Sequence, residues 1–480
     1  MPTRSTARAL AALACLLAPA TAATAAPDDY AQAEAHIDAH LDDHGERALH
    51  LWELAEVGYQ ERESSSVLQT ALTENGFSVR PGIAGMPTAF VAEYGSGSPV
   101  VALLAEFDAL PGMSQEAEPQ RRARVEGGAG HACGHHLFGA GSVAAAIAVK
   151  EWLEDTGSPG TLRVYGTPAE EGGAAKAYMA RDGLFADTDV ALHWHPFDRN
   201  EVSFKTTLAN RSAKFRFTGA PAHAAHAPER GRSALDGVEA MNFMVNLLRE
   251  HVPQQTRIHY VITDGGDAPN IVPGEAEVFY YVRHPDPAEL HKIWERVVDA
   301  SKGAAAGTGT TVDHEIIHGV NSLLPNEPLS RRAQEHLERV GGVRYDAREL
   351  DFARELRKTL TDPKLALGSE ETIQPFELQL SSSSTDVGDV SWVVPTTGVR
   401  TATWVPGTPP HSWQAVAAGG TSIGIQGMRQ AAKVLAATAI DVFLDSDLVD
   451  RARADHATRR AGQPYQSLIG DRSPPLDYRR

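Results

Sequence analysis

The sequence predicts an α/β protein that carries a smaller inserted block of α+β structure. The chain has 480 residues, more than one simple core accommodates, so two domains or one domain with a large insertion is expected. Between residues 100 and 195, apolar runs suited to buried parallel strands alternate with helical segments. From about residue 207 to 320 the strands alternate polar and apolar residues, which is typical of an open antiparallel sheet with helices packed on it.

The first part of the chain predicts helices followed by the strands of a parallel sheet. Over residues 30–80, leucines and Trp52 recur among charged residues, and Gly76 ends this helical region. Val100–Phe107 is a continuous apolar run, as expected for a central parallel strand. The elements predicted next are a helix at Leu137–Leu153, a strand at Thr161–Gly166, a helix at Ala174–Arg181 and a strand at Asp189–His195.

The sequence of the inserted block predicts a different order of elements. The predicted elements are a strand near 206–218, a helix at Ala234–Arg249, strands at Arg257–Thr263 and Ala276–Arg283, and a helix at Pro287–Ser301. The α/β pattern then resumes and ends in a helix at Ile423–Phe443. We expect the charged, proline-rich tail after Arg451 to pack only partly. The predicted limits are 27–206 and 321–450 for the two halves of the α/β domain, 207–320 for the insert and 451–480 for the tail.

The N-terminus has the features of an export signal. Arg4 and Arg8 precede the short apolar stretch Ala9–Ala20, and Ala23-Thr24-Ala25 offers a cleavage site with small residues. We therefore expect residues 1–26 to be removed on export, which yields a periplasmic or secreted protein; a lipid anchor on Cys15 is the weaker alternative. The stretch is too short to span a bilayer, and no later segment resembles a membrane span.

The net charge and the cysteine content limit the classes of ligand and of site that the protein can have. The formal net charge of -18 argues against a surface for nucleic acid or anionic lipid. Removal of the signal leaves Cys133 as the single cysteine, so the exported protein has no internal disulfide. A buried inert thiol is one explanation of Cys133, and a metal ligand is the other, which the neighbouring histidines favour.

Two segments offer the residue types that hold zinc and related metals. In Gly130-His131-Ala132-Cys133-Gly134-His135-His136, the side chains of Cys133 and His135 face the same way on an extended segment, and the glycines let the backbone approach an ion. In Pro168-Ala169-Glu170-Glu171-Gly172-Gly173, one carboxylate can bind metal while the other acts as a general base, which metal-assisted hydrolysis requires. A negatively charged helix N-terminus is the alternative explanation of the glutamate pair.

Three further segments supply candidate groups. Leu192-His193-Trp194-His195-Pro196 ends a strand and presents His193 and His195 on one face, and the residues alone leave open which of them binds. His411 lies in a turn before a helix, in Pro409-Pro410-His411-Ser412-Trp413. Asp108 follows the strand Val100–Phe107, where it either orients a metal-bound histidine or caps a loop.

In their order along the chain, the motifs GHACGH, PAEEGG, LHWHP and PPHSW resemble the M20 family of metallopeptidases and amidohydrolases. The branch most similar contains hippurate hydrolases, auxin-conjugate amidohydrolases and the B subunit of p-aminobenzoyl-glutamate hydrolase. The resemblance covers about residues 30–445 and implies a zinc-peptidase-like mixed-sheet catalytic domain with an inserted dimerisation, or lid, domain. It implies one or two divalent ions, with zinc favoured over manganese or cobalt.

The same resemblance implies roles for individual residues. Glu170 becomes the general base, and the metal ligands are Cys133, His135, Glu171, His411 and one of His193 and His195. His136 stands where many relatives have aspartate, so the orienting role of that aspartate does not carry over.

The inserted block carries further matches to the family. Ala222-His223-Ala224-Ala225 resembles the lid segment whose histidine stabilises the reaction's oxyanion, often in the active site of the partner subunit. Asn270, in Asn270-Ile271-Val272-Pro273, matches an asparagine near substrate, and Arg283 is a candidate for binding a substrate carboxylate. A homodimer is implied.

The function predicted from these residues is metal-dependent hydrolysis of an amide bond. The expected substrates are small N-acyl or N-aroyl amino acids, of the p-aminobenzoyl-glutamate or hippurate type, or small dipeptides. One alternative is an exported metallo-carboxypeptidase or dipeptidase that acts on peptides. The other is a non-catalytic metal-binding or solute-binding protein, which would have no need of a general base beside its metal ligands.

Overall fold

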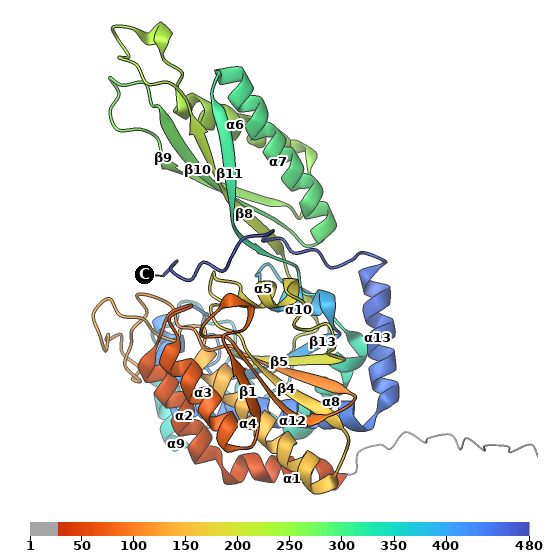
Figure 1. Cartoon of the computed structure of the whole chain (residues 1–480). Coiled ribbons are helices and arrows are strands. Elements are labelled where there is room, and N and C mark those ends of the chain that lie inside the picture. Colours follow the sequence, from red (N-terminus) through yellow and green to blue (C-terminus); the bar gives the residue numbers. More distant parts are fainter. Residues whose placement is uncertain (1–26, 480) are drawn as a thin grey trace, which may run out of the picture.

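The computed structural model describes residues 27–479 and shows a larger α/β part from which a smaller α+β part projects (Figure 1). This architecture confirms the predicted fold class. The predicted signal peptide, residues 1–26, lies outside the described residues.

A seven-stranded mixed sheet forms the centre of the larger part, in the order β1-β2-β4-β3-β5-β13-β6. Its strands are β1 (Ser78–Pro81), β2 (Phe90–Ser96), β3 (Val100–Ala105), β4 (Gly160–Gly166), β5 (Val190–Phe197), β6 (Glu201–Val202) and β13 (Thr396–Ala402). The adjacent strands β4, β3, β5 and β13 are parallel, whereas the outer strands pair antiparallel. Every residue of β3 is buried, which explains its continuous apolar sequence.

Helices cover this sheet (Figure 1). They are α1 (Pro27–Ala39), α2 (Leu41–Leu54), α3 (Arg62–Glu74), α4 (His135–Thr156), α5 (Ala175–Arg181), α8 (Glu327–Val340), α9 (Ala347–Arg357), α10 (Val387–Val393), α11 (Trp413–Gly419), α12 (Ser422–Leu444) and α13 (Ser446–Arg460). The two long helices α4 and α12 are rich in alanine and glycine and pack against each other. Over residues 27–479, no helix has both the length and the apolar character needed to cross a lipid bilayer.

The smaller part is a four-stranded antiparallel sheet with two helices. Its elements are β8 (Ala209–Thr218), α6 (Ala234–Leu248), β9 (Arg257–Asp264), β10 (Glu275–His284), α7 (Pro287–Thr308) and β11 (Thr311–Val320), and the strand order is β11-β8-β10-β9. A separate core that includes Phe215, Tyr280 and Trp294 holds the helices on the sheet. No strand is predicted at β11, because its positions at the sheet edge are mostly half-exposed and its polar residues hide the strand pattern.

The C-terminal tail packs more closely than the sequence predicts. The predicted limit at residue 450 falls inside α13, and the chain after it crosses between the two parts of the molecule (Figure 1). Leu468 is buried in the core of the smaller part, and its neighbour Ile469 is buried in that of the larger part. Two isolated apolar residues in a charged segment give little sequence signal, yet they anchor the tail.

Candidate metal centre and active site

The predicted metal ligands of the larger part gather at the carboxyl ends of the parallel strands. The glutamate pair follows β4, and His195 lies near the end of β5; Asp108, predicted to orient a ligand or to cap a loop, follows β3. His135 is the first residue of α4. Because parallel strands all end at one edge of their sheet, residues far apart in the sequence meet there. A cavity of about 230 Å³ is lined by Cys133, Glu170, Glu171, His195 and His411.

Two groups of ligand atoms share the thiol of Cys133. The first group is Cys133, His135 and His195, and the second is Cys133, Glu171 and His411; within each, the ligand atoms lie within 4.8 Å of one another. Cys133 Sγ is 3.5 Å from His195 Nε2, and His411 Nε2 is 2.9 Å from Glu171 Oε1. Two adjacent three-ligand groups with a common sulfur form a donor set for a pair of divalent ions.

Neighbouring acceptors orient the histidine ligands. His135 Nδ1 lies 2.8 Å from Asp108 Oδ1, so its Nε2 faces the other ligands. The second oxygen of Asp108 accepts a hydrogen bond of 2.9 Å from the backbone N–H of Glu171, which ties the two groups together. His195 Nδ1 lies 2.7 Å from the carbonyl oxygen of Pro196, which leaves Nε2 for a ligand.

Two buried polar atoms of the donor set also indicate that it fits a metal ion. Among the described residues, His135 Nε2 is buried 3.1 Å from Glu106 Oε2, and Glu171 Oε1 is buried 2.9 Å from His411 Nε2, yet neither atom makes a hydrogen bond of acceptable geometry. Buried polar atoms of this kind are costly unless something satisfies them. A divalent cation would satisfy both.

The structure distinguishes His193 from His195, which the sequence left as equal candidates for the metal ligand. His195 belongs to the first ligand group, whereas His193 belongs to none of the groups found among residues 27–479. Burial, followed by the positive charges of Lys205, Lys176 and Arg400, lowers the pKa of His193 to about 3. His193 therefore lies in a cationic environment, in the wall of the same cavity but outside the groups of ligand atoms.

Glu170 lies beside the ligands in a buried network of charges. With Glu106 and His135 it forms a third group of neighbouring donor atoms. Burial, followed by the carboxylates of Glu106 and Glu171, raises the pKa of Glu170 well above its usual 4.5. Lys176 Nζ lies 2.8 Å from Glu106 Oε1 and 2.7 Å from Asp386 Oδ1.

No specific role is predicted from the sequence for Glu106, Lys176 or Asp386, although Glu106 stands among the carboxylates that end the strand before Asp108. A carboxylate at the end of a buried strand and a lysine in an apolar helix are weak signals for the first two. Asp386 has no local signal, because only the fold brings it to the site.

The remaining histidines of the cysteine motif support the backbone. His131 Nε2 lies 3.0 Å from the carbonyl oxygen of Leu51, and His136 Nε2 lies 3.0 Å from that of Gly419. Both rings are buried. They hold α2 and the C-terminal end of α11 against the metal motif.

The predicted residues of the smaller part lie away from the ligands. His223 and Asn270 are neighbours, since the N–H of Ala224 donates to the carbonyl oxygen of Asn270 at 3.0 Å, and both residues are exposed. Arg283 is half-buried on β10, with its guanidinium 5.5 Å from the ring centre of Tyr281. None of the three lines the cavity of the metal ligands.

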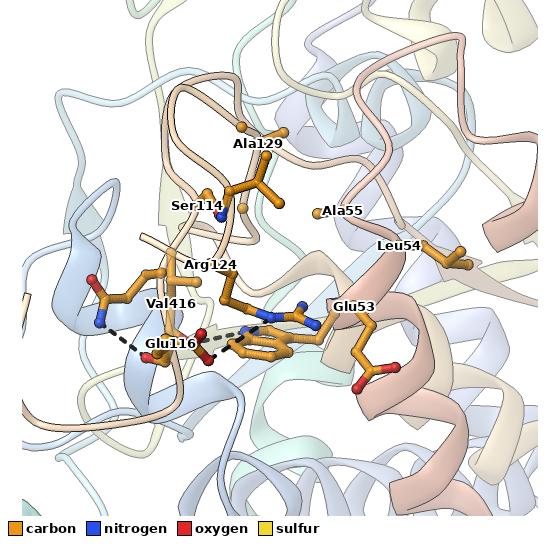
Figure 2. Close-up of a pocket in the computed structure, with 13 residues that line it drawn as sticks. Glu53, Leu54, Ala55, Ser114, Glu116, Arg124, Ala129 and Val416 are labelled. Atoms are coloured by element: carbon orange, nitrogen blue, oxygen red, sulfur yellow. Dashed lines mark hydrogen bonds and ion pairs between the residues drawn. The ribbon is translucent and has the colours of Figure 1, made fainter. Parts of the chain in front are cut away.

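A larger cavity of about 440 Å³ lies next to the metal motif but outside the ligand set (Figure 2). Arg124 stacks over the ring of Trp52, 4.7 Å from its centre, and pairs with Glu116 at 4.0 Å. No residue of the three donor groups lines this cavity. Cavity size therefore does not identify the reactive site, and the converging donor atoms do.

Comparisons with known proteins agree with this geometry. A family model described as a peptidase dimerisation domain matches residues 209–308. The chain is 40% identical to the B subunit of p-aminobenzoyl-glutamate hydrolase from Escherichia coli, over 87% of this chain and 93% of that protein. It is 30% identical to the Xaa-Arg dipeptidase of Mus musculus, over 84% of this chain and 86% of that protein.

The fold also matches solved structures. One is a dinuclear metal-binding peptidase of the M20 family from Bacillus subtilis, with a TM-score of 0.56 and 17% identity. That match covers 84% of this chain and 99% of the bacterial peptidase. At this identity the likeness bears on the fold alone.

Proposed function

Because the chain belongs to the M20 family of metal-dependent peptidases and amidohydrolases, we propose that it hydrolyses the amide bond of small N-acyl or N-aroyl amino acids. The similarity to the B subunit of p-aminobenzoyl-glutamate hydrolase supports an aroyl amino acid as the substrate. The similarity to a dipeptidase keeps small dipeptides as the second candidate.

This proposal depends mainly on the carboxyl group of Glu170, which lies beside the two donor groups that share Cys133 but belongs to neither of them. Glu170 lies next to the ligands, and Glu171 supplies the ligand oxygen, so the pair divides the two tasks. A bound divalent cation supplies Lewis acidity, which acidifies water and polarises the scissile carbonyl. Glu170 takes the proton from the attacking water and returns it to the leaving amine. Zinc is the proposed ion, because a thiolate ligand favours it.

Replacement of Glu170 tests the proposed function. We expect Glu170→Gln to lower kcat about 100- to 10,000-fold, because the proton acceptor is lost. The variant should retain its metal, measured by elemental analysis, whereas Glu171→Gln should lose metal as well as activity. Near-normal turnover by Glu170→Gln on N-benzoyl-glutamate would show that the role is misassigned.

We also propose that the active site is completed by a second copy of the chain. His223 and Asn270 lie outside the cavity within one chain, so a partner would have to bring them to it. The smaller part exposes Phe243 and Leu247 on α6 and Val261 on β9. Because β9 is an edge strand with unpaired backbone groups, this apolar surface suits pairing with its own copy.

Mixing two inactive variants tests this sharing. Glu170→Gln and His223→Ala are each expected to be inactive alone. In mixed dimers, one of the two sites combines an intact Glu170 with an intact His223, so random exchange should restore about a quarter of the wild-type activity. Absence of any recovery after verified subunit exchange would show that each site is built from one chain.

We propose export as the destination of the protein. The basic residues, the short apolar stretch and the small-residue site within residues 1–26 support it. Sequencing of the mature N-terminus is the test, with a start near residue 26 or 27 expected.

A further inference from the structure

The cavity of the metal ligands has a second, positively charged end. Lys205, on the short strand β7 (Lys205–Thr206), lines this cavity and is 5% exposed. Within residues 27–479, its ammonium group makes no hydrogen bond and no ion pair. A buried charge without a partner is unfavourable, and proteins retain one chiefly where a ligand supplies the partner.

Arg400 adds a second cation next to Lys205. It lies on β13, in register with His195 of β5 and with Glu201 of β6. One guanidinium nitrogen donates to Glu201 Oε1 at 3.0 Å, and the guanidinium carbon is 4.0 Å from the ring centre of Phe197. The Nε–H of Arg400 is buried without a partner. In the described part of the chain, Arg400 therefore pairs with the one carboxylate next to it, and Lys205 pairs with none.

The remaining residues at this end are neutral. Ser203, Ser383 and Ser384 contribute hydroxyl groups, whereas the acidic residues of the cavity belong to the metal end. Burial, followed by the charge of Arg400, holds the pKa of Lys205 well below its usual 10.5. An anion bound here would relieve this repulsion and restore the charged lysine.

We infer that Lys205 and Arg400 form a subsite that binds a carboxylate group of the substrate while its amide lies at the metal ligands. This inference rests on the proposed function, because it places the carboxylate and the scissile amide in one cavity. A ligand with two ends of this kind is an N-acyl amino acid, which carries a carboxylate near its amide. The guanidinium of an arginine side chain would be repelled from this end.

The two carboxylates of an N-acyl glutamate are both candidates for the subsite. N-benzoyl-glutamine lacks only the side-chain carboxylate, and the α-amide of N-benzoyl-glutamate lacks only the α-carboxylate. Comparison of the three compounds therefore identifies the carboxylate that Lys205 contacts.

The experiment measures kcat/KM of the zinc-loaded enzyme for these three compounds. Lys205→Met should lower the value for N-benzoyl-glutamate about 10- to 100-fold, mainly through KM, since a charge-assisted hydrogen bond is lost. For the one amide that lacks the contacted carboxylate, Lys205→Met should change the value less than about threefold. Lys205→Arg should recover much of the loss, and Lys292→Met, on the exposed face of α7, should have no effect.

Binding measurements separate this inference from the proposed function. Calorimetric titration of N-benzoyl-glutamate into the Glu170→Gln protein should show binding that Lys205→Met weakens by the same factor. If wild type hydrolyses none of the compounds but still binds N-benzoyl-glutamate through Lys205, the proposed function is wrong and the subsite stands. An equal loss on all three compounds, or binding that is unaffected in a Lys205→Met or Arg400→Gln protein with normal metal content, would overturn the subsite.

Discussion

Single side chains decide where the metal ligands point. Cys133 is buried among the histidine ligands, and its thiol belongs to both donor groups. Burial raises the pKa of Cys133 above its usual 9.0 in the metal-free protein. A thiol must lose its proton to bind a metal, so this proton is released when a metal binds.

Metal affinity should therefore increase with pH. With a raised thiol pKa, Cys133 stays protonated near neutrality, and each proton released makes the affinity rise about tenfold per pH unit. We expect Cys133→Ala to reduce this slope by about one proton as well as to weaken binding. Competition with a chelator between pH 6 and 8 gives both values. An unchanged slope would mean that the thiol does not ligate.

The two histidines of β5 should respond differently to replacement. His195→Ala removes a ligand of the first group, so the bound metal measured by elemental analysis should fall, with loss of activity. His193→Ala should keep its metal, because His193 lies outside the donor groups. Equal loss of metal from the two variants would contradict the assignment.

Contacts between elements place these side chains. Gly134, just before α4, has a φ of 80°, which favours glycine. A Cβ at this position would lie 2.6 Å from Cβ of Pro196, the residue after His195. The absence of a side chain thus allows the start of α4 to meet the end of β5, which brings Cys133 and His135 to His195.

Gly134→Ala should therefore disturb the metal centre as well as the backbone. The positive φ costs roughly 1–2 kcal/mol, and the contact with Pro196 adds about 1–3 kcal/mol and displaces His195. Gly85→Ala is the matched control, because Gly85 has a φ of 70° and no atom within 4 Å of the added Cβ. We expect the unfolding temperature to fall in both variants and metal content to fall in Gly134→Ala alone. Equal metal content would show that the close approach is dispensable.

The larger apolar elements were predictable, and the polar ones were not. The buried strand β3 and the long helices α4 and α12 appear in the sequence as apolar runs, because burial on all sides selects apolar residues. The strand β11 was missed because half-exposed edge positions accept polar residues. The site followed the same rule, since motifs with several ligands in a few residues were visible and isolated residues such as Asp386 were not.

In the whole molecule, the C-terminal tail links the two parts and reaches the active site. Tyr478 Oη and a guanidinium nitrogen of Arg479 donate to the backbone carbonyl of Glu171, at 3.0 and 2.7 Å. A side-chain nitrogen of Arg472 donates to the carbonyl oxygen of Ile317 in β11. The tail therefore supports the loop that carries Glu170 and Glu171.

Two truncations should separate these contributions. Removal of residues 473–480 takes away both hydrogen bonds to Glu171, so kcat should fall about 10- to 100-fold through misplacement of the loop. The unfolding temperature should fall only slightly, because Leu476 and Tyr478 are partly buried against the core. Removal of residues 463–480 also deletes the buried residues Leu468 and Ile469, which uncovers the core around them, so the unfolding temperature should fall by several degrees. Full activity of the shorter truncation would show that the tail does not position Glu171.

The amino-acid sequence alone determined the fold class, the metal motifs and the membership of the family, because each depends on local patterns of burial or on clustered ligands. The tertiary structure decided which histidine of β5 joins the ligands, which charges surround Glu170, and where the unpaired Lys205 lies. These features depend on residues separated by tens or hundreds of positions along the chain. Only the parallel sheet, by ending its central strands at one edge, brings them within a few ångströms of one another.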